Sequence, residues 1–199
     1  MRLLANFSEE ERNLLVALPY RAGLWLSRCD STGGEESDDA EINALRSIIT
    51  GFSEDFLKSE FVEEIMRETV SRKDMWPEWE KDTDDVPAEC TKAVEIVAAH
   101  LEEKDTASFK QNLMEIAMTV ALAYREFDDS QPLIEKLKIY MQYYRQRLMA
   151  VIKNTQILSL DEYLNISRAE HEALTRLSAA LRMEYREGLP PQNLTSAEG

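Results

Sequence analysis

Residues 15–30 read LVALPYRAGLWLSRCD, and residues 113–129 read LMEIAMTVALAYREFDD. Small and large apolar residues fill both stretches, one charge interrupts each of them early, and each ends on an acid. Both fall short of the roughly 20 uninterrupted apolar residues that a membrane span requires. They therefore predict two buried helices at the centre of the fold, and their likeness suggests a duplicated unit of a few helices.

The rest of the composition also favours helices. The 199 residues are 44% apolar, which is enough for one core, and include only six Gly and six Pro. Alternating β-branched runs are almost absent, whereas Leu, Ala, Glu, Lys, Arg and Met favour helices. We therefore predict an all-α protein, a compact bundle of about seven to eight helices. The predicted organisation is one domain at 1–188, with duplicated halves at 8–73 and 87–154, C-terminal helices within 159–187, and a disordered tail at 189–199.

Capping signals divide the chain into helices. Ser8 and Glu11 form a capping box that begins a first helix, which ends at Arg28 and contains Pro19. The segment 74–86 has no helical period and predicts a central linker. The other helices are expected at Asp38–Thr50 before Gly51, from Ser53 to Val70, at Pro87–Leu101, from Asp105 or Thr106 to Phe127, at Pro132–Asn154, from Ser159, and at Ser167–Tyr185.

The charge balance limits the partners. A net charge of -15 repels nucleic acids and anionic membrane surfaces, so we expect neither a nucleic-acid partner nor membrane insertion. Cations, basic protein surfaces or a second copy of the chain are the expected partners. The first residues lack the apolar core of a signal peptide, which favours a cytoplasmic location. Cys29 and Cys90 are then expected to stay reduced.

An acidic segment, DSTGGEESDDAE, occupies residues 30–41. It does not fit an EF-hand, because Gly34 falls on a ligand position and Glu35 on the position that requires glycine. A looser oxygen site for calcium or magnesium is one interpretation. The other is that Asp38 and Asp39 stabilise a helix N-terminus while the remaining acids are solvated. The candidate metal ligands are Asp30, Glu35, Glu36, Asp38 and Glu41.

Lone charges interrupt the two apolar stretches, Arg21 in the first and Glu115 in the second. Desolvation is costly at such positions unless a partner is present. We therefore expect Arg21 and Glu115 to form a buried polar pair if the two helices face one another. A structural ion pair and a functional site are both compatible with this pattern.

A tyrosine-rich stripe marks the predicted helix at Pro132–Asn154. Tyr140 and Tyr144 lie one turn apart, with Tyr143 beside them. Such amphipathic aromatic residues are enriched in interface cores, which makes this face a candidate contact for a partner or a second copy. Packing against the C-terminal helix is the alternative.

The order of features in the first half resembles the tellurite-resistance TerB-like superfamily. An apolar helix with Ala22 and Gly23 leads to Asp30, then to a glycine at Gly33 or Gly34, and then to the Ser37 and Glu41 start of the next helix. The resemblance covers about residues 14–129. It implies an all-helical fold with internal duplication, acidic residues that bind metal, and a role in stress response. The acidic loop is longer than the family's Asp-Gly turn, and no glycine follows Asp128 in the second copy.

These features favour a non-enzymatic, TerB-like helical protein that responds to divalent cations or binds a protein partner. A small metal-dependent helical enzyme that uses Glu115 is an alternative, and it requires a polar pocket inside the bundle. A purely structural oligomerisation module is the third interpretation.

Overall fold

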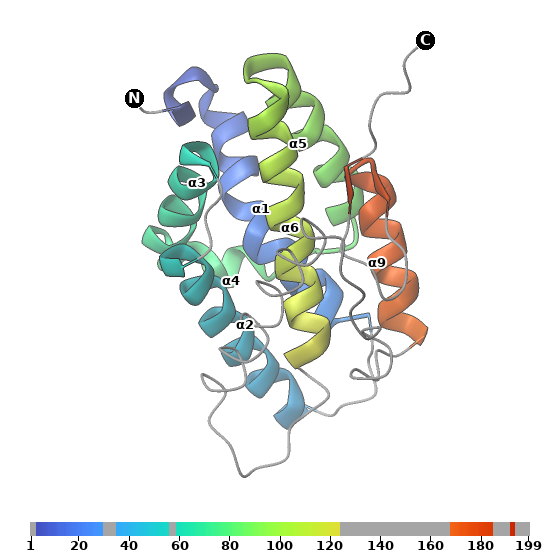
Figure 1. Ribbon diagram of the computed structural model, residues 1–199. Coiled ribbons are helices and arrows are strands. Elements are labelled where there is room, and N and C mark those ends of the chain that lie inside the picture. Colours follow the sequence, from blue (N-terminus) through green and yellow to red (C-terminus); the bar gives the residue numbers. More distant parts are fainter. Residues whose placement is uncertain (1–2, 30–34, 56–58, 124–167, 185–191, 194–199) are drawn as a thin grey trace.

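The computed structural model describes residues 3–29, 35–55, 59–123, 168–184 and 192–193. The described part is an all-α bundle with seven α-helices, as predicted (Figure 1). The helices are α1 (Glu9–Ser27), α2 (Glu35–Asp55), α3 (Glu60–Ser71), α4 (Trp76–Trp79), α5 (Val86–His100), α6 (Glu103–Ala123) and α9 (Arg168–Ala180). The described part also contains two 3-10 turns, η1 (Leu3–Asn6) and η2 (Lys73–Met75), and two short strands, β1 (Met183–Glu184) and β2 (Gln192–Asn193).

Helix α1 is the centre of the bundle. It packs against α6, α5, α3 and α2, which surround it in Figure 1. The predicted capping box begins it, because the Ser8 hydroxyl accepts from Glu11 N and the Glu11 carboxylate accepts from Ser8 N. From Leu15 to Ser27 every residue except Arg21 is buried. The two apolar stretches therefore meet in the core, since α6 carries the second one.

The centre of the bundle is tightest at Gly23. A Cβ at this position would lie 2.5 Å from Leu45 Cδ1, 3.3 Å from Val120 Cγ2 and 3.4 Å from Ile116 Cγ2. Helices α1, α2 and α6 therefore approach one another at a point where any side chain on α1 would intrude.

Pro19 interrupts the hydrogen bonding of α1, and α3 makes a contact in the same turn. Proline has no N–H, so the carbonyl of Leu15 loses its usual helical donor. The buried hydroxyl of Thr69 lies 2.6 Å from the carbonyl oxygen of Val16 in α1 and 2.9 Å from that of Ile65 in its own helix. Thr69 therefore fastens α3 to the part of α1 that the proline weakens.

We expect Thr69→Val to lower the free energy of unfolding by about 1 kcal/mol, because the core loses an interhelical hydrogen bond with little change of shape. Urea denaturation measures the change. Thr175→Val is the matched control, since the exposed Thr175 donates only to His171 O within α9. Equal stability of the two variants would show that the Val16 contact contributes nothing.

The predicted bounds of the second and third helices are wrong. Helix α2 begins at Glu35 rather than at Asp38, and it continues through Gly51 to Asp55. Glycine costs a helix about 1 kcal/mol, which burial of Phe52 in the core outweighs. The Ser53 hydroxyl donates to Thr50 O inside α2, and Ser59 is the residue that caps α3.

The first part of the segment predicted as an irregular linker, up to Trp79, is folded into η2 and α4, whereas residues 80–85 form a non-helical turn before α5. Trp76 and Trp79 bury their side chains against the bundle. The Trp76 ring stacks on Tyr20 with 4.7 Å between ring centroids, and its Nε1 donates to Thr69 O at 3.1 Å. Burial of two large aromatic rings orders this segment despite its lack of period.

The predicted helices at 87–101 and from 105 or 106 correspond to α5 and α6, although α6 begins slightly earlier, at Glu103. The C-terminal helix ends at Ala180, before the predicted end at Tyr185. Arg182 then takes a φ of 52°, and Met183–Glu184 pair antiparallel with Gln192–Asn193. Gln192–Asn193 lie within the tail 189–199 that was predicted to be disordered, so that prediction is wrong for these two residues. The predicted helices at 132–154 and from 159 lie outside the described residues. No helix in the described ranges is long and apolar enough to cross a membrane.

Candidate functional site

Arg21, the one residue between Leu15 and Ser27 of α1 that is not buried, holds the turn after α4. Its Nε and Nη2 bind the two carboxylate oxygens of Glu89 at 2.9 Å each. Its Nη1 donates to the carbonyls of Trp79 and Lys81 at 3.1 Å, and its Nη2 also donates to that of Asp82 at 2.9 Å. One guanidinium therefore ties α1, α5 and the turn together.

The partner of Arg21 differs from the predicted one. Its guanidinium binds Glu89 of α5 and not Glu115, which lies half-buried on α6 and accepts from Gln111 Nε2 at 3.1 Å. Glu89 stands in the first turn of α5, next to the carbonyls of the turn, so a single arginine satisfies all of these acceptors. The sequence spacing alone contained no signal for this arrangement.

A second arginine completes the hold on residues 79–83, which we call the arginine-held turn. Arg28 Nη1 donates to Glu80 O at 2.7 Å and to Thr83 Oγ1 at 3.1 Å. With the contacts of Arg21, each carbonyl from residue 79 to residue 82 accepts from an arginine of α1. These bonds keep Asp82 in the left-handed region, with a φ of 47°.

The side chain of Glu80 ties the same turn to α1 and α2. Its Oε1 accepts from the Tyr20 hydroxyl at 2.7 Å and from Arg46 Nη2 of α2 at 2.9 Å. Burial raises the pKa of Tyr20, and the hydrogen bond to Glu80 raises it further, so the phenol stays protonated and donates. The turn is thus held at both its backbone and its side chain.

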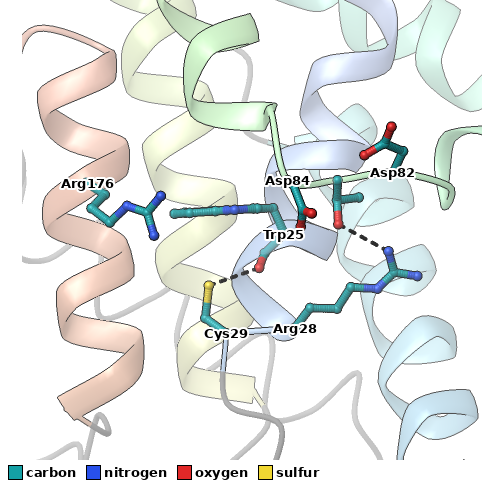
Figure 2. A pocket seen from close by; sticks show the side chains of 7 residues that line it. Trp25, Arg28, Cys29, Asp82, Asp84 and Arg176 are labelled. Carbon is teal, nitrogen blue, oxygen red and sulfur yellow. Dashed lines mark hydrogen bonds between the residues drawn. The ribbon is translucent and has the colours of Figure 1, made fainter.

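The arginine-held turn forms one wall of an open cleft of about 460 Å³ (Figure 2). The end of α1 forms the floor, and Arg176 of α9 reaches in from the side opposite the turn. The lining residues are Trp25, Arg28, Cys29, Asp82, Thr83, Asp84 and Arg176. This volume lies within the usual range of ligand sites.

The cleft contains charges of both signs that do not pair with each other. Arg28 and Arg176 contribute two guanidinium groups, and Asp82 and Asp84 contribute two carboxylates. The ion pairs within the described residues include none between these two arginines and these two aspartates. Arg176 lies instead over the Trp25 ring, with its Cζ 5.5 Å from the ring centroid.

Cys29 is a neutral thiol in this cleft. Burial raises its pKa, and nearby Glu170 raises it further against the opposite effect of Arg176. Its Sγ lies 3.2 Å from the carbonyl oxygen of Trp25, to which the thiol donates. A protonated thiol is a weak nucleophile, so the cleft chemistry rests on its charged groups and its aromatic ring.

The predicted metal ligands are only partly placed. Glu35, Glu36, Asp38 and Glu41 lie in the first two turns of α2, but their side chains, and all of Asp30, are outside the described residues. Over the part of the chain that the structure describes, no group of three or more His, Cys, Asp or Glu side chains is arranged to hold a metal ion. The calcium or magnesium site therefore stays a prediction.

The predicted contact face at Tyr140, Tyr143 and Tyr144 also lies outside the described residues. Sequence reasoning missed the cleft, because its residues come from three segments that only the fold brings together. One local signal was present: Asp82 and Asp84 stand in a short acidic run, DTDD, directly before the predicted helix at Pro87.

No family model, curated protein or solved structure matches this chain. The TerB-like resemblance of residues 14–129 therefore stays a prediction. The function has to be inferred from the cleft and from the chemistry of the side chains that line it.

Proposed function

We propose that this chain is a non-enzymatic helical binding module of the TerB-like type, and that the cleft beside Trp25 receives a protein partner. The observation that carries the proposal is a set of opposite charges around an indole ring in one open cleft, with no ion pair between them in the described part of the chain. Exposed charges that face one another without pairing are available to a ligand, and Trp and Arg are the residues most enriched at binding hot spots.

The rigidity of the cleft supports the same proposal. The arginine-held turn is fixed by hydrogen bonds from α1, and Trp25 is only 6% exposed, so its ring is held in the core. Because these parts of the cleft are already fixed in the unbound protein, they lose little conformational entropy when a partner binds.

Site-specific photo-crosslinking in cells that express the protein tests this proposal. A photoreactive residue is placed at position 176 or 84, and at exposed Lys104 of α6 as the control position. We expect one protein, or a second copy of this chain, to be crosslinked from both cleft positions and not from the control. Identical crosslinking patterns from all three positions would reject the cleft as the binding site.

A cation response is a second candidate function, favoured by the early start of α2. Glu35, Asp38 and Glu41 follow one another at three-residue spacing in its first two turns, which places them near one face of the helix. Crowded carboxylates repel each other, and a bound divalent cation relieves that repulsion.

We therefore expect millimolar calcium, magnesium or manganese to raise the melting temperature relative to chelator, because a ligand that binds only the folded state stabilises it. Differential scanning calorimetry measures the shift. The double substitution Asp30→Asn with Glu41→Gln is expected to abolish it. A wild-type melting temperature that is the same with and without metal would leave these acids as stabilisers of the helix N-terminus only.

A further inference from the structure

Arg176 is positioned to bind a carboxylate. Its guanidinium is placed over the ring of Trp25, and no hydrogen-bond acceptor for it is found among the residues that the structure describes. The flat guanidinium carries five N–H donors whose geometry matches the two oxygens of a carboxylate. Contact with a fixed ring restricts the arginine side chain, so it loses less entropy when it binds.

Arg28 adds a second donor group to the same cleft. Only its Nη1 is engaged, with Glu80 O and Thr83 Oγ1, so within the described residues Nε and Nη2 remain available. Arg28 comes from the end of α1 and Arg176 from α9, as Figure 2 shows. The Arg28 guanidinium lies on the side of Trp25 that faces the turn, however, whereas Arg176 lies on the side of α9, so Arg176 is the donor that is free to bind an anion away from the aspartates.

The turn offers the opposite charge. Asp82 and Asp84 are exposed, and neither has an ion-pair partner within the described part of the chain. In Figure 2 Asp82, in the arginine-held turn, and Asp84, directly after it, lie on the opposite side of Trp25 from α9. Because bonds to the backbone of the turn fix its position, the carboxylates cannot move across to neutralise Arg176 without breaking those bonds.

We infer that the cleft recognises a peptide segment of mixed charge, whose carboxylate binds Arg176 while a neighbouring basic group binds Asp82 or Asp84. This inference rests on the proposed function, and it names the chemistry of the partner. The Trp25 ring, which is almost fully buried, lies between the two charged ends and fixes the distance between them.

The charge of the whole chain makes a segment of one sign less suitable. A phosphorylated or purely acidic segment meets two carboxylates in the cleft and a net charge of -15 around it. A purely basic segment is attracted to the whole surface, but it meets two arginines inside the cleft. Only a segment that carries both signs pairs with every charged group.

Three synthetic peptides of equal length with blocked termini test this inference: alternating Glu-Lys, all Glu, and all Lys, each with a fluorescent label. Binding to the full-length protein is followed by fluorescence anisotropy at low salt. We expect the alternating peptide to bind at least about tenfold more tightly than the all-Glu peptide, since each satisfied charge pair adds to the affinity. Arg176→Gln and Asp84→Asn should each weaken it about fivefold, whereas Arg67→Gln on the exposed face of α3 should leave it unchanged.

A charge swap is the sharpest version of the test. Arg176→Glu or Asp84→Lys alone should abolish specific binding of the alternating peptide. The double variant Arg176→Glu with Asp84→Lys should recover it, because an alternating peptide matches the reversed pattern after a shift by one residue. Circular dichroism of each variant confirms that the helices are retained.

Two results would overturn the inference. The first is that the all-Lys peptide binds most tightly and with the same affinity to every variant. Binding would then reflect general attraction of a basic peptide to an acidic protein. The inference also fails if the all-Glu peptide binds as tightly as the alternating peptide and only Arg176 substitutions weaken it. That result would mean that the cleft binds a carboxylate alone, and the proposed function would still stand. The proposed function itself fails separately, when no crosslink is specific to positions 176 and 84.

Discussion

Arg21→Ala is expected to lower the free energy of unfolding by about 3 kcal/mol. The substitution leaves Glu89 and the carbonyls of Trp79, Lys81 and Asp82 without their shared donor. Breaking a buried ion pair from one side costs about 3 to 5 kcal/mol. The lower end applies here because the side chains of Arg21 and Glu89 are 12% and 28% exposed, so water can replace part of what is lost.

Urea denaturation followed by tryptophan fluorescence measures this change. Arg67→Ala is the control, because Arg67 pairs with Glu63 on the surface of α3 and its loss should cost about 0.5 kcal/mol or less. Arg21→Lys keeps the charge but not the planar fork, so it should recover only part of the stability. An Arg21→Ala variant as stable as the Arg67→Ala variant would contradict the role assigned to this guanidinium.

Gly23→Val should destabilise the protein by about 3 kcal/mol, because overpacking a filled core costs about 1 to 3 kcal/mol or more. The added atoms meet Leu45 and Val120, which are both fully buried and cannot move into solvent. Gly23→Ala should cost less, since the end of the Leu45 side chain can shift and alanine is the better helix former.

Two further variants make this prediction specific to the crowding at Gly23. Leu45→Ala should rescue part of the loss in the Gly23→Val background, although the same change alone removes core contacts. Gly51→Ala, at a half-buried position inside α2, should instead stabilise by up to about 1 kcal/mol. Thermal melts compare these variants with the wild-type protein. A Gly23→Val protein as stable as wild type would mean that the helices can separate at no cost.

Local signals predicted much of the fold. The Ser8 and Glu11 capping box, the two central apolar helices and the start of α5 next to Pro87 all depend on residues close together in the chain. Gly51 and the linker were misread because long-range burial, of Phe52 and of Trp76, outweighed a local preference. Propensity is weak whenever tertiary packing competes with it.

The candidate site was less predictable for the same reason. Arg21 was singled out correctly as an unusual charge, but its partner Glu89 is far away in the sequence, and nothing local distinguishes it from the other acid of α5, Glu95. Arg176 and Asp84 each look like ordinary surface residues in the sequence. Only the packing of α9 beside α1 brings them to one cleft.

The hold of α1 on the turn has a consequence for how the protein resists cleavage. Exposed turns are usually the first places that proteases cut, because opening them locally requires little free energy. Residues 79–83 cannot open without releasing the arginines of the most buried helix. The turn and the core therefore form one cooperative unit, and the exposed peptide bonds around Asp82 survive a protease for as long as the bundle stays folded.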